Sequence, residues 1–323
     1  MIGPAATDPT APEVSTPETP TTETAPPETV TPGTSVTDLP TGIRTPVPTS
    51  GPVPEHPLLV VRQDAGVTYL YVLDGDSGEL LGTPAIETAF SISDPVITRE
   101  GLIAYTRETG DSSRIEMLEW GTTEPAVFGD LDEARSPAFS PDGVTLAYVE
   151  QGVTIPRASI VFVAVSTGQE LRRLTWRDDE TDFFRTNGSI HDLEWSPDGS
   201  RLLFISSYEG AEALTVEVDA ESLSEAVRAV EADVLAVSWS GADSVVALGW
   251  CCYPEYDGAR QAYAGPVGAA DPAFGDEQFD DVDAASNGEV ALVAGGGLTI
   301  VGTDGQRRDV IGTESGIVSG DLF

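Results

Sequence analysis

A repeat of about 43 residues is the feature that most constrains the fold of this chain. Two copies are plain, at residues 136–148 and 192–204, and both contain Ser-Pro-Asp-Gly between two apolar stretches. The motif predicts a tight turn, because proline presets the first corner, aspartate bonds its own backbone and glycine adopts the left-handed conformation. Each copy therefore predicts a short strand, a turn and a second strand. Self-similarity at this period indicates a fold built from repeated units.

Weaker copies follow the same pattern, and the residue before each turn serves as a marker that recurs every 42 to 56 residues. The five markers are Ile97, Phe139, Trp195, Trp239 and Ala284. A third strand with alternating apolar residues follows most pairs, as in Tyr69–Leu73 and Ile160–Ala164. A poorer fourth strand usually comes next, as in Leu171–Leu174. Four antiparallel strands per repeat predict the blade of a β-propeller.

The two ends of the repeat region predict how the ring closes. The first blade opens at Leu58 without an inner strand or its turn, whereas residues 316–323 resemble an inner strand with no blade after it. If the C-terminal segment supplies the missing strand, the ring closes at six blades and leaves no open sheet edge. The predicted fold is all-β: a six-bladed propeller of four-stranded antiparallel blades over residues 56–323, closed by Ile317–Phe323.

The Ser-Pro-Asp-Gly copies at 136–148 and 192–204 resemble the repeats of TolB-like propellers, which also occur in the propeller domains of prolyl oligopeptidases. The resemblance spans residues 58–323, with a strong motif in these two copies and a weak one elsewhere. It implies a periplasmic or cell-envelope propeller that binds other proteins or gates access to a channel. It brings no set of catalytic residues with it.

Residues 1–55 have a different composition, with 13 of the 24 prolines, 14 threonines and no aromatic residue. Such a segment buries too little apolar surface to offset the entropy of ordering, so it predicts a disordered linker. Pro/Thr-rich linkers hold a domain away from a surface. We expect residues 1–50 to make no contact with the propeller. The start of the chain lacks the pattern of a signal peptide, so we expect membrane association only through an anchor absent from this chain.

The formal net charge is −38, from 54 acidic residues against 16 basic ones, and all sixteen bases are arginines. A protein this acidic is not expected to bind nucleic acid, because the phosphate contacts that dominate such binding would be repulsive. Solubility or adaptation to high salt explains the charge, and attraction of cations or of a basic partner is the alternative. We expect a monomer whose partner is an envelope protein or ligand.

The connections between strands indicate a binding face. In a propeller blade the first and third turns open on one face, while the second turn and the crossing to the next blade open on the other. The first turns are short, as at 140–143 and 196–199. The long connections are predicted on the other face, at 106–113, 150–158, 177–189, 250–261 and 268–281. Loops on a rigid scaffold often carry function, so this loop-rich face is the predicted binding face.

An insertion at residues 177–185 stretches one repeat step to 56 residues. Its candidate binding residues are Asp178, Asp179, Asp182, Phe183 and Phe184. The three acids could hold calcium, which takes several oxygen ligands, but the motif of a calcium-binding loop is absent. Solvated acids are therefore the favoured interpretation, and no cofactor is expected. The two phenylalanines are candidates for a partner anchor or for local packing.

The only cysteines, Cys251 and Cys252, are adjacent. Neighbouring cysteines do not suit a zinc site, which needs spaced ligands. Buried thiols and a disulfide between neighbours remain, and an extracytoplasmic setting favours the disulfide. Tyr253 and Tyr256 beside them suit a binding rim, because tyrosine combines an apolar body with a polar tip.

Tests for catalytic motifs favour a binding protein. Residues 75–78 (Gly-Asp-Ser-Gly) match a protease nucleophile motif but fall in a turn between two strands, and the chain has only His56 and His191 as bases for it. We expect His191 to be a structural inner-strand residue. The favoured function is a non-catalytic extracytoplasmic propeller, tethered to the cell envelope, that binds a protein or ligand through its loop-rich face.

The alternative function is a propeller enzyme, a lyase or glycan hydrolase, with carboxylates at the mouth of the channel. A pocket with two converging carboxylates, at least one of them with a raised pKa, would favour the enzyme. A flat aromatic loop face would favour the binding protein.

Overall fold

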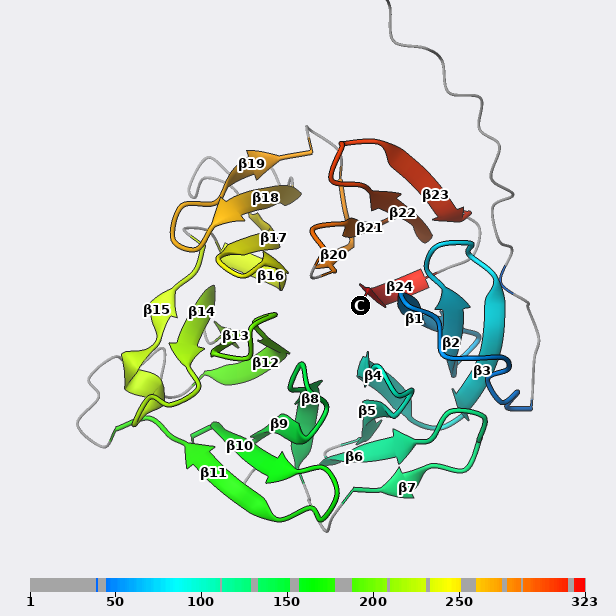
Figure 1. Ribbon diagram of the computed structural model, residues 1–323, viewed down its shortest axis with the longest axis horizontal. Coiled ribbons are helices and arrows are strands. Elements are labelled where there is room, and N and C mark those ends of the chain that lie inside the picture. The colour runs from blue at the N-terminus through cyan, green and yellow to red at the C-terminus, as the bar shows by residue number, and fades with distance from the viewer. Residues whose placement is uncertain are drawn as a thin grey trace, which may run out of the picture. The chain divides into compact units, whose positions relative to one another are not determined.

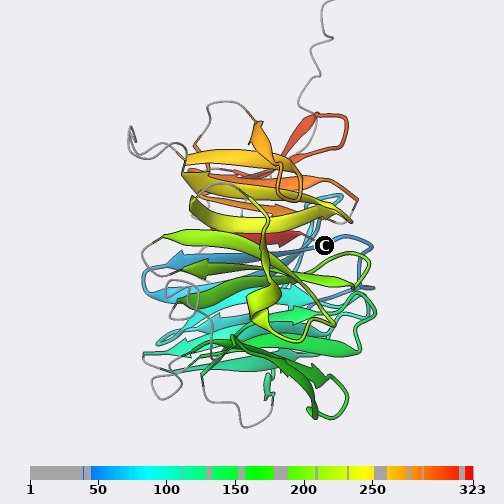
Figure 2. The ribbon, with the colours of Figure 1, turned by 90° about the vertical axis from the view of Figure 1, so that its left-hand side faces the viewer.

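The computed structural model describes residues 39, 45–110, 112–128, 133–151, 157–177, 188–207, 210–230, 233–250, 260–274, 278–285, 287–312 and 317–322. These residues form six four-stranded antiparallel sheets arranged as blades around one axis (Figure 1). Viewed from the side, the sheets of successive blades lie face to face (Figure 2). The helical structure of the described residues is one 3₁₀ turn, η1 (Leu223–Glu225), and none of their helices is long and apolar enough to cross a membrane.

Each blade runs from an innermost strand at the axis to an outermost strand at the rim. Blade 1 contains β24 (Ile317–Leu322), β1 (Pro57–Asp64), β2 (Val67–Asp74) and β3 (Leu80–Glu87). Blade 2 contains β4 (Ser91–Ile97), β5 (Ile103–Thr109), β6 (Ser112–Leu118) and β7 (Ala126–Val127). Blade 3 contains β8 (Ala134–Phe139), β9 (Thr145–Glu150), β10 (Ser159–Ala164) and β11 (Glu170–Leu174).

The other three blades follow the same order from axis to rim. Blade 4 contains β12 (Ser189–Trp195), β13 (Arg201–Ser207), β14 (Ala211–Glu217) and β15 (Val227–Arg228). Blade 5 contains β16 (Asp233–Gly241), β17 (Ser244–Trp250), β18 (Arg260–Pro266) and β19 (Asp271–Ala273). Blade 6 contains β20 (Asp281–Ala284), β21 (Val290–Ala294), β22 (Gly297–Val301) and β23 (Arg307–Ile311).

The turn chemistry predicted from the repeat is confirmed. Four of the five markers are the last residues of innermost strands, and Trp239 lies near the end of β16. In the turn after β8, Asp142 Oδ1 accepts a hydrogen bond of 2.6 Å from the Ser140 hydroxyl, and Gly143 has a φ of 70°. The four residues of the motif thus supply the bonds and the left-handed corner of the turn.

Ring closure by the C-terminal segment is also confirmed, over residues 317–322. β24 pairs antiparallel with β1, so that Leu58 lies opposite Leu322 and Val61 opposite Ser319. The first and last parts of the chain therefore share one sheet beside the axis, blue next to red in Figure 1.

The core lies between the blades. Alternate residues of β1 pack in opposite directions: Leu58 and Val60 contact the cluster shared with blade 6, and Leu59 and Val61 contact the cluster shared with blade 2. Both faces of the sheet are therefore covered. This explains why its strands are continuous apolar runs rather than alternating ones.

Two of the predicted long connections contain strands. Residues 106–113 are mostly the ends of β5 and β6, with Thr109 opposite Ser112 in the ladder. Residues 268–281 contain β19, which pairs with β18. Both segments are polar, but backbone pairing to the neighbouring strand does not depend on apolar side chains, and the pattern therefore misled the prediction.

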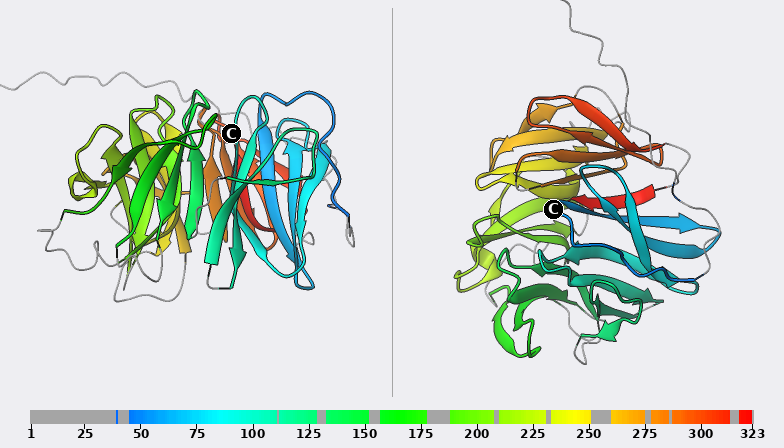
Figure 3. Two further views of the ribbon diagram at one scale, coloured as in Figure 1. Left: turned by 90° about the horizontal axis from the view of Figure 1, so that it is seen from below. Right: turned by 45° about the vertical axis from the view of Figure 1, so that its right-hand side comes forward.

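A segment before blade 1 packs against the propeller, and we call residues 45–56 the strap. Val47 exchanges two backbone hydrogen bonds of 2.8 Å with Thr83 in β3, and the Ser50 amide donates to Leu81 at 3.0 Å. Further upstream, the buried Leu39 accepts a bond from Arg62. The expectation that residues 1–50 make no contact with the propeller is therefore wrong for residues 39 and 45–50. In Figure 3 the strap, in dark blue, lies beside the strands of blade 1.

The length of β3 explains why the strap docks there. β3 has 8 residues, whereas the outermost strands of the other blades have 2 to 5. A long outer edge presents unpaired backbone groups, and proteins commonly cover such edges. The strap covers the outer edge of β3. Prolines stand at 46 and 48, on either side of the pairing residue Val47, at positions whose amides do not pair with β3.

Candidate functional site: the axial cavity

The axis of the propeller holds a cavity of about 650 Å³. Its wall is formed by the innermost strands of blades 2 to 6 and by residues 54–57, where the strap joins β1. It also includes Thr98, Ser140 and Gly143 from the first turns of blades 2 and 3. The cavity therefore lies toward the face of the short turns, opposite the predicted loop-rich binding face.

β-Bulges in three innermost strands aim polar side chains at the axis. The strand register shifts between Ser93 and Val96 in β4, between Arg135 and Ala138 in β8 and between His191 and Glu194 in β12. Each bulge holds one residue with a positive φ: Asp94 (48°), Ser136 (47°) and Asp192 (51°). Non-glycine residues rarely adopt this conformation, although aspartate tolerates it better than most, and a bulge re-aims the side chain. Asp94 and Asp192 both line the cavity.

Carboxylates dominate the charged groups of the cavity wall. Of the residues that the structure describes, seven acids line it, against Arg99 and His56 as the basic side chains: Glu55, Asp94, Asp192, Glu194, Asp280, Asp281 and Asp283. They come from blades 2, 4 and 6 and from the strap, so negative charge surrounds the axis. Among the described residues no cluster of three or more acids, histidines or cysteines is arranged to hold a metal ion.

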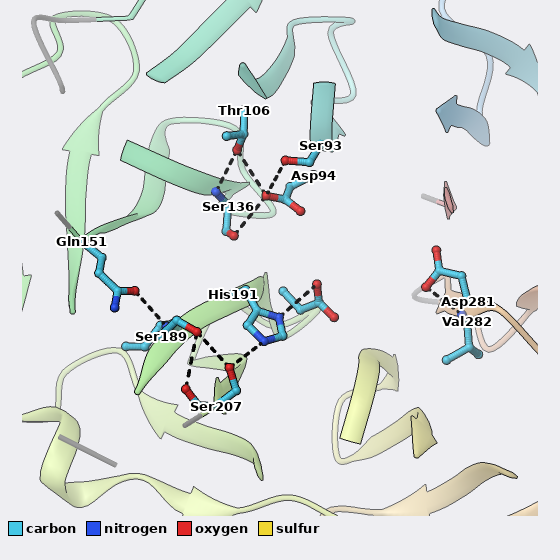
Figure 4. Close-up of polar contacts among 12 residues, drawn as sticks. Ser93, Asp94, Thr106, Ser136, Gln151, Ser189, His191, Ser207, Asp281 and Val282 are labelled. Atoms are coloured by element: carbon cyan, nitrogen blue, oxygen red, sulfur yellow. Dashed lines mark hydrogen bonds and ion pairs between the residues drawn. The ribbon is translucent and has the colours of Figure 1, made fainter. Parts of the chain in front are cut away.

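Asp94, a residue of the cavity wall, links two blades. Its Oδ2 accepts hydrogen bonds from the Ser136 hydroxyl at 3.1 Å and from the Thr106 hydroxyl at 3.2 Å (Figure 4). Burial raises the pKa of Asp94 and the nearby charge of Asp192 adds to the rise, while the two hydroxyl donors oppose it. Asp94 is therefore both a contact between blades 2 and 3 and a carboxyl that favours its neutral form more than usual.

Glu194 makes the corresponding contact between blades 4 and 5. Its Oε2 accepts a hydrogen bond of 3.0 Å from the Trp239 amide. Burial raises the pKa of Glu194 well above its usual range, and the charge of Asp283 adds to this effect. The neighbouring Ser238 hydroxyl accepts a bond from the Ala284 amide at 3.1 Å, which continues the polar contacts to blade 6.

Replacing Glu194 with Gln is expected to change how stability depends on pH. A raised pKa in the folded state means that the neutral carboxyl is favoured by folding. The carboxyl of Glu194 therefore adds to stability below the pKa that it has in the unfolded chain. This stability is lost as pH rises through its pKa in the folded protein. The melting temperature of Glu194→Gln minus that of wild type should therefore increase as pH rises from about 4 to 8, because glutamine never ionises.

Thermal melts of both proteins across this pH range test the expectation. Glu217→Gln is the matched control, because Glu217 is exposed at the end of β14 in the same blade. A difference in melting temperature between Glu194→Gln and wild type that stays constant with pH would contradict the assignment of Glu194.

His191 lies beside the acidic wall in a polar cluster. Its Nε2 is 3.3 Å from the Ser207 hydroxyl, which is 2.8 Å from that of Ser189 (Figure 4). Burial would lower the pKa of His191, but the Asp192 carboxylate outweighs it and raises the pKa. The His191 Nδ1 to Asp192 Oδ1 separation is 3.8 Å, longer than a hydrogen bond, so the imidazole is not oriented as in a catalytic triad.

The site residues predicted from the sequence lie outside the described residues. They fall in two segments, 178–187 and 251–259, and comprise Asp178, Asp179, Asp182, Phe183, Phe184, Cys251, Cys252, Tyr253 and Tyr256. Their binding role and the disulfide stay predictions. None of the cavity carboxylates was singled out from the sequence, although aligning the repeats on their markers points to three of them. Asp94, Asp192 and Asp281 all stand three residues before a marker.

No family model matches the chain, and no curated protein matches it. Among solved structures, TolB from Acinetobacter baumannii matches 85% of this chain and 68% of its own, with a TM-score of 0.62 and 17% identity. A chain of a nidogen/laminin complex matches 83% of this chain and 98% of its own, with a TM-score of 0.59 and 11% identity. The tricorn protease matches 83% of this chain and 30% of its own, with a TM-score of 0.52 and 12% identity.

The three similar structures include both a protease and proteins not named as enzymes, and at these identities the likeness concerns the fold. The number of blades, the closure by β24 and the Ser-Pro-Asp-Gly turns all agree with the repeat resemblance found in the sequence. The chain is a six-bladed β-propeller whose fold is similar to that of TolB.

Proposed function

We propose that the protein is a non-catalytic binding propeller of the cell envelope, which binds a ligand with several positive charges in its axial cavity. The observation that carries the proposal is the composition of the cavity wall, whose described residues include seven carboxylates against Arg99 and His56. The cavity volume of about 650 Å³ lies within the range of roughly 300–1,000 Å³ that is usual for ligand pockets.

The energetics of the wall favour a positively charged ligand. The carboxylates repel one another, and burial in a medium of low dielectric strengthens that repulsion. The raised pKa values of Asp94 and Glu194 reflect both effects. An ammonium or guanidinium group placed among the carboxylates would relieve the repulsion and favour their ionised forms. Because the acids are spread over three alternate blades, a peptide with several lysines or arginines matches them better than a single charge.

The cellular setting in this proposal rests on the sequence. The Pro/Thr-rich composition before the strap is that of a spacer which holds a domain away from a surface, and the net charge of −38 would attract basic partners. In the proposal, residues 1–44 connect the propeller to the envelope, and the loop-rich face with the insertion at 177–185 offers a second contact surface.

Calorimetric titration of the full chain with tetralysine at low salt tests the binding site. Asp192→Asn removes one wall charge and keeps the side-chain shape, so affinity should fall by about fivefold or more. Glu217→Gln removes the same charge from the exposed surface of the same blade and should change affinity by less than about twofold, because exposed charges are screened. Equal affinity of Asp192→Asn and wild type would refute the cavity as the site.

A propeller enzyme is the second candidate, because one observation favours it. Two carboxyls with raised pKa values, Asp94 and Glu194, line one cavity, and each has a charged neighbour in Asp192 or Asp283. A carboxyl of raised pKa can act as a proton donor to a glycosidic oxygen. The binding function is preferred because both carboxyls accept hydrogen bonds from the neighbouring blade, which accounts for their burial.

A screen of acidic and neutral glycans for cleavage separates the two functions. Turnover that is abolished in both Glu194→Gln and Asp283→Asn, while both variants remain folded, would replace the binding proposal with the enzyme.

A further inference from the structure

The strap contributes to the cavity although it lies outside the repeats. Residues 45–50 run along the outer edge of blade 1, and residues 54–57 form part of the cavity wall. Glu55 and His56 are the ionisable side chains of that part of the wall. The strap therefore connects the rim of the propeller to its axis across the face of the short turns.

Three glycines lie where the strap crosses blades 1 and 2. A Cβ atom on Gly82 in β3 would lie 2.8 Å from Thr49 Cα and 2.9 Å from the Pro48 carbonyl oxygen. A Cβ on Gly75 would lie 2.6 Å from the carbonyl oxygen of His56, and a Cβ on Gly101 would lie 2.7 Å from Val53 Cγ2. At Gly82 and Gly75 the close atoms belong to backbone, so a methyl group there has no room while the strap is docked.

Hydrogen bonds hold the strap at the same places. The buried Thr49 hydroxyl accepts a bond of 2.7 Å from the Gly121 amide, and the Trp120 indole donates to the Gly51 carbonyl at 2.9 Å. The Gly75 amide donates to the His56 carbonyl at 2.8 Å, next to Glu55. Backbone and side-chain hydrogen bonds thus hold the strap along its length, and the last of them, at His56, lies beside the cavity.

We propose that the strap is part of the binding site: its docking over Gly82 and Gly75 positions Glu55 and His56 on the cavity wall, and Glu55 contributes to recognition of the positively charged ligand. This inference rests on the proposed function. A docked strap presents Glu55 before the ligand arrives, so binding does not have to order it. Gly82 is a positioning residue in this scheme, because its contacts are with the strap on the rim.

Gly82→Ala in the full chain tests the positioning role. Gly82 does not have a left-handed φ, so alanine suits the strand itself, and the clash is with the strap. Hydrogen exchange of the Val47 and Ser50 amides should become faster, and affinity for tetralysine should fall about fivefold. Gly241→Ala is the matched control, because its nearest contact would be Ser244 Cβ at 3.9 Å, and it should leave both measurements unchanged.

Glu55→Gln tests the recognition role separately. It should leave hydrogen exchange of the strap unchanged and lower affinity for tetralysine by about threefold or more. If Gly82→Ala releases the strap, or Glu55→Gln removes the charge, and affinity stays at the wild-type value while Asp192→Asn still weakens binding, the inference about the strap is overturned and the proposed function stands. If wild type does not bind tetralysine, or Asp192→Asn binds it equally well, the proposed function fails and the inference fails with it.

Discussion

Deletion of residues 317–323 is expected to leave a chain that no longer folds cooperatively at 37 °C. β24 pairs with five residues of β1, whose Leu58, Leu59 and Val60 have no exposed surface. Without β24 the backbone edge of β1 loses its partner and water reaches these side chains from that edge, at about 1.5–3 kcal/mol for each one fully exposed. Exposing two or three of them would consume much of the 5–15 kcal/mol that is typical of a whole domain. Circular dichroism melts and analytical ultracentrifugation measure the loss and any association through the open edge.

Deletion of residues 1–38 is the matched control for this truncation. It keeps Leu39 and the whole strap, so the melting temperature should stay within about two degrees of wild type. A 1–316 chain that melts as cooperatively as wild type, within a few degrees, would show that closure by β24 is not what holds the ring together.

Glu116→Ala is expected to cost about 3 kcal/mol, because it removes the buried carboxylate shared by the buried Tyr105 hydroxyl and the partly exposed Arg107 and Arg114. Glu116, in β6, has a side chain 2% exposed and accepts hydrogen bonds from the Tyr105 hydroxyl at 2.8 Å, from Arg107 at 3.1 Å and from Arg114 at 3.0 Å. Arg107 also pairs with Glu87 of blade 1 at 3.3 Å, so the cluster connects two blades. Urea unfolding measures the change in free energy.

Glu170→Ala is the control for Glu116→Ala. Glu170 pairs with Arg173 at 2.9 Å but is 48% exposed, so its loss should cost less than about 1 kcal/mol. Equal costs of the two variants would contradict the assignment of Glu116 to a buried ionic cluster.

The pH dependence of the Glu116→Ala effect follows from the pKa of Glu116. Burial opposes ionisation, but the hydrogen bonds from Tyr105 and Arg114 outweigh it and lower the pKa. A lowered folded-state pKa contributes stability above the unfolded pKa and loses it as pH falls through the folded pKa. The difference between wild type and Glu116→Ala should therefore shrink in strong acid.

The blades could be predicted because their signals are local. The Ser-Pro-Asp-Gly turn needs four consecutive residues, and Asp142 and Gly143 make its contacts within that span. The strand after each turn needs only a short apolar run. Counting repeats then predicted six blades, and the incomplete first blade predicted that β24 would pair with β1.

The strap was missed because its docking depends on another part of the chain. Composition measures how much apolar surface a segment can bury, and by that measure residues 1–55 are disordered. Val47 docks instead through backbone bonds to Thr83, which exist only because β3 has a long free edge and Gly82 has no side chain. Hydrogen-bonding of this kind does not appear in hydrophobic patterning.

By itself the sequence determined the repeat, the turns, the blade count and the strand that closes the ring, because each depends on neighbouring residues or on counting them. Only the tertiary structure decided that the acids line one cavity and that the strap forms part of its wall. Asp94 and Asp281 lie on different blades, and they share one cavity because the ring brings their strands to a common axis. The bulges that turn Asp94 and Asp192 inward arise where each innermost strand pairs with the next strand of its blade. The position of Glu55 depends on contacts of the strap with Gly75 and Gly82 of blade 1.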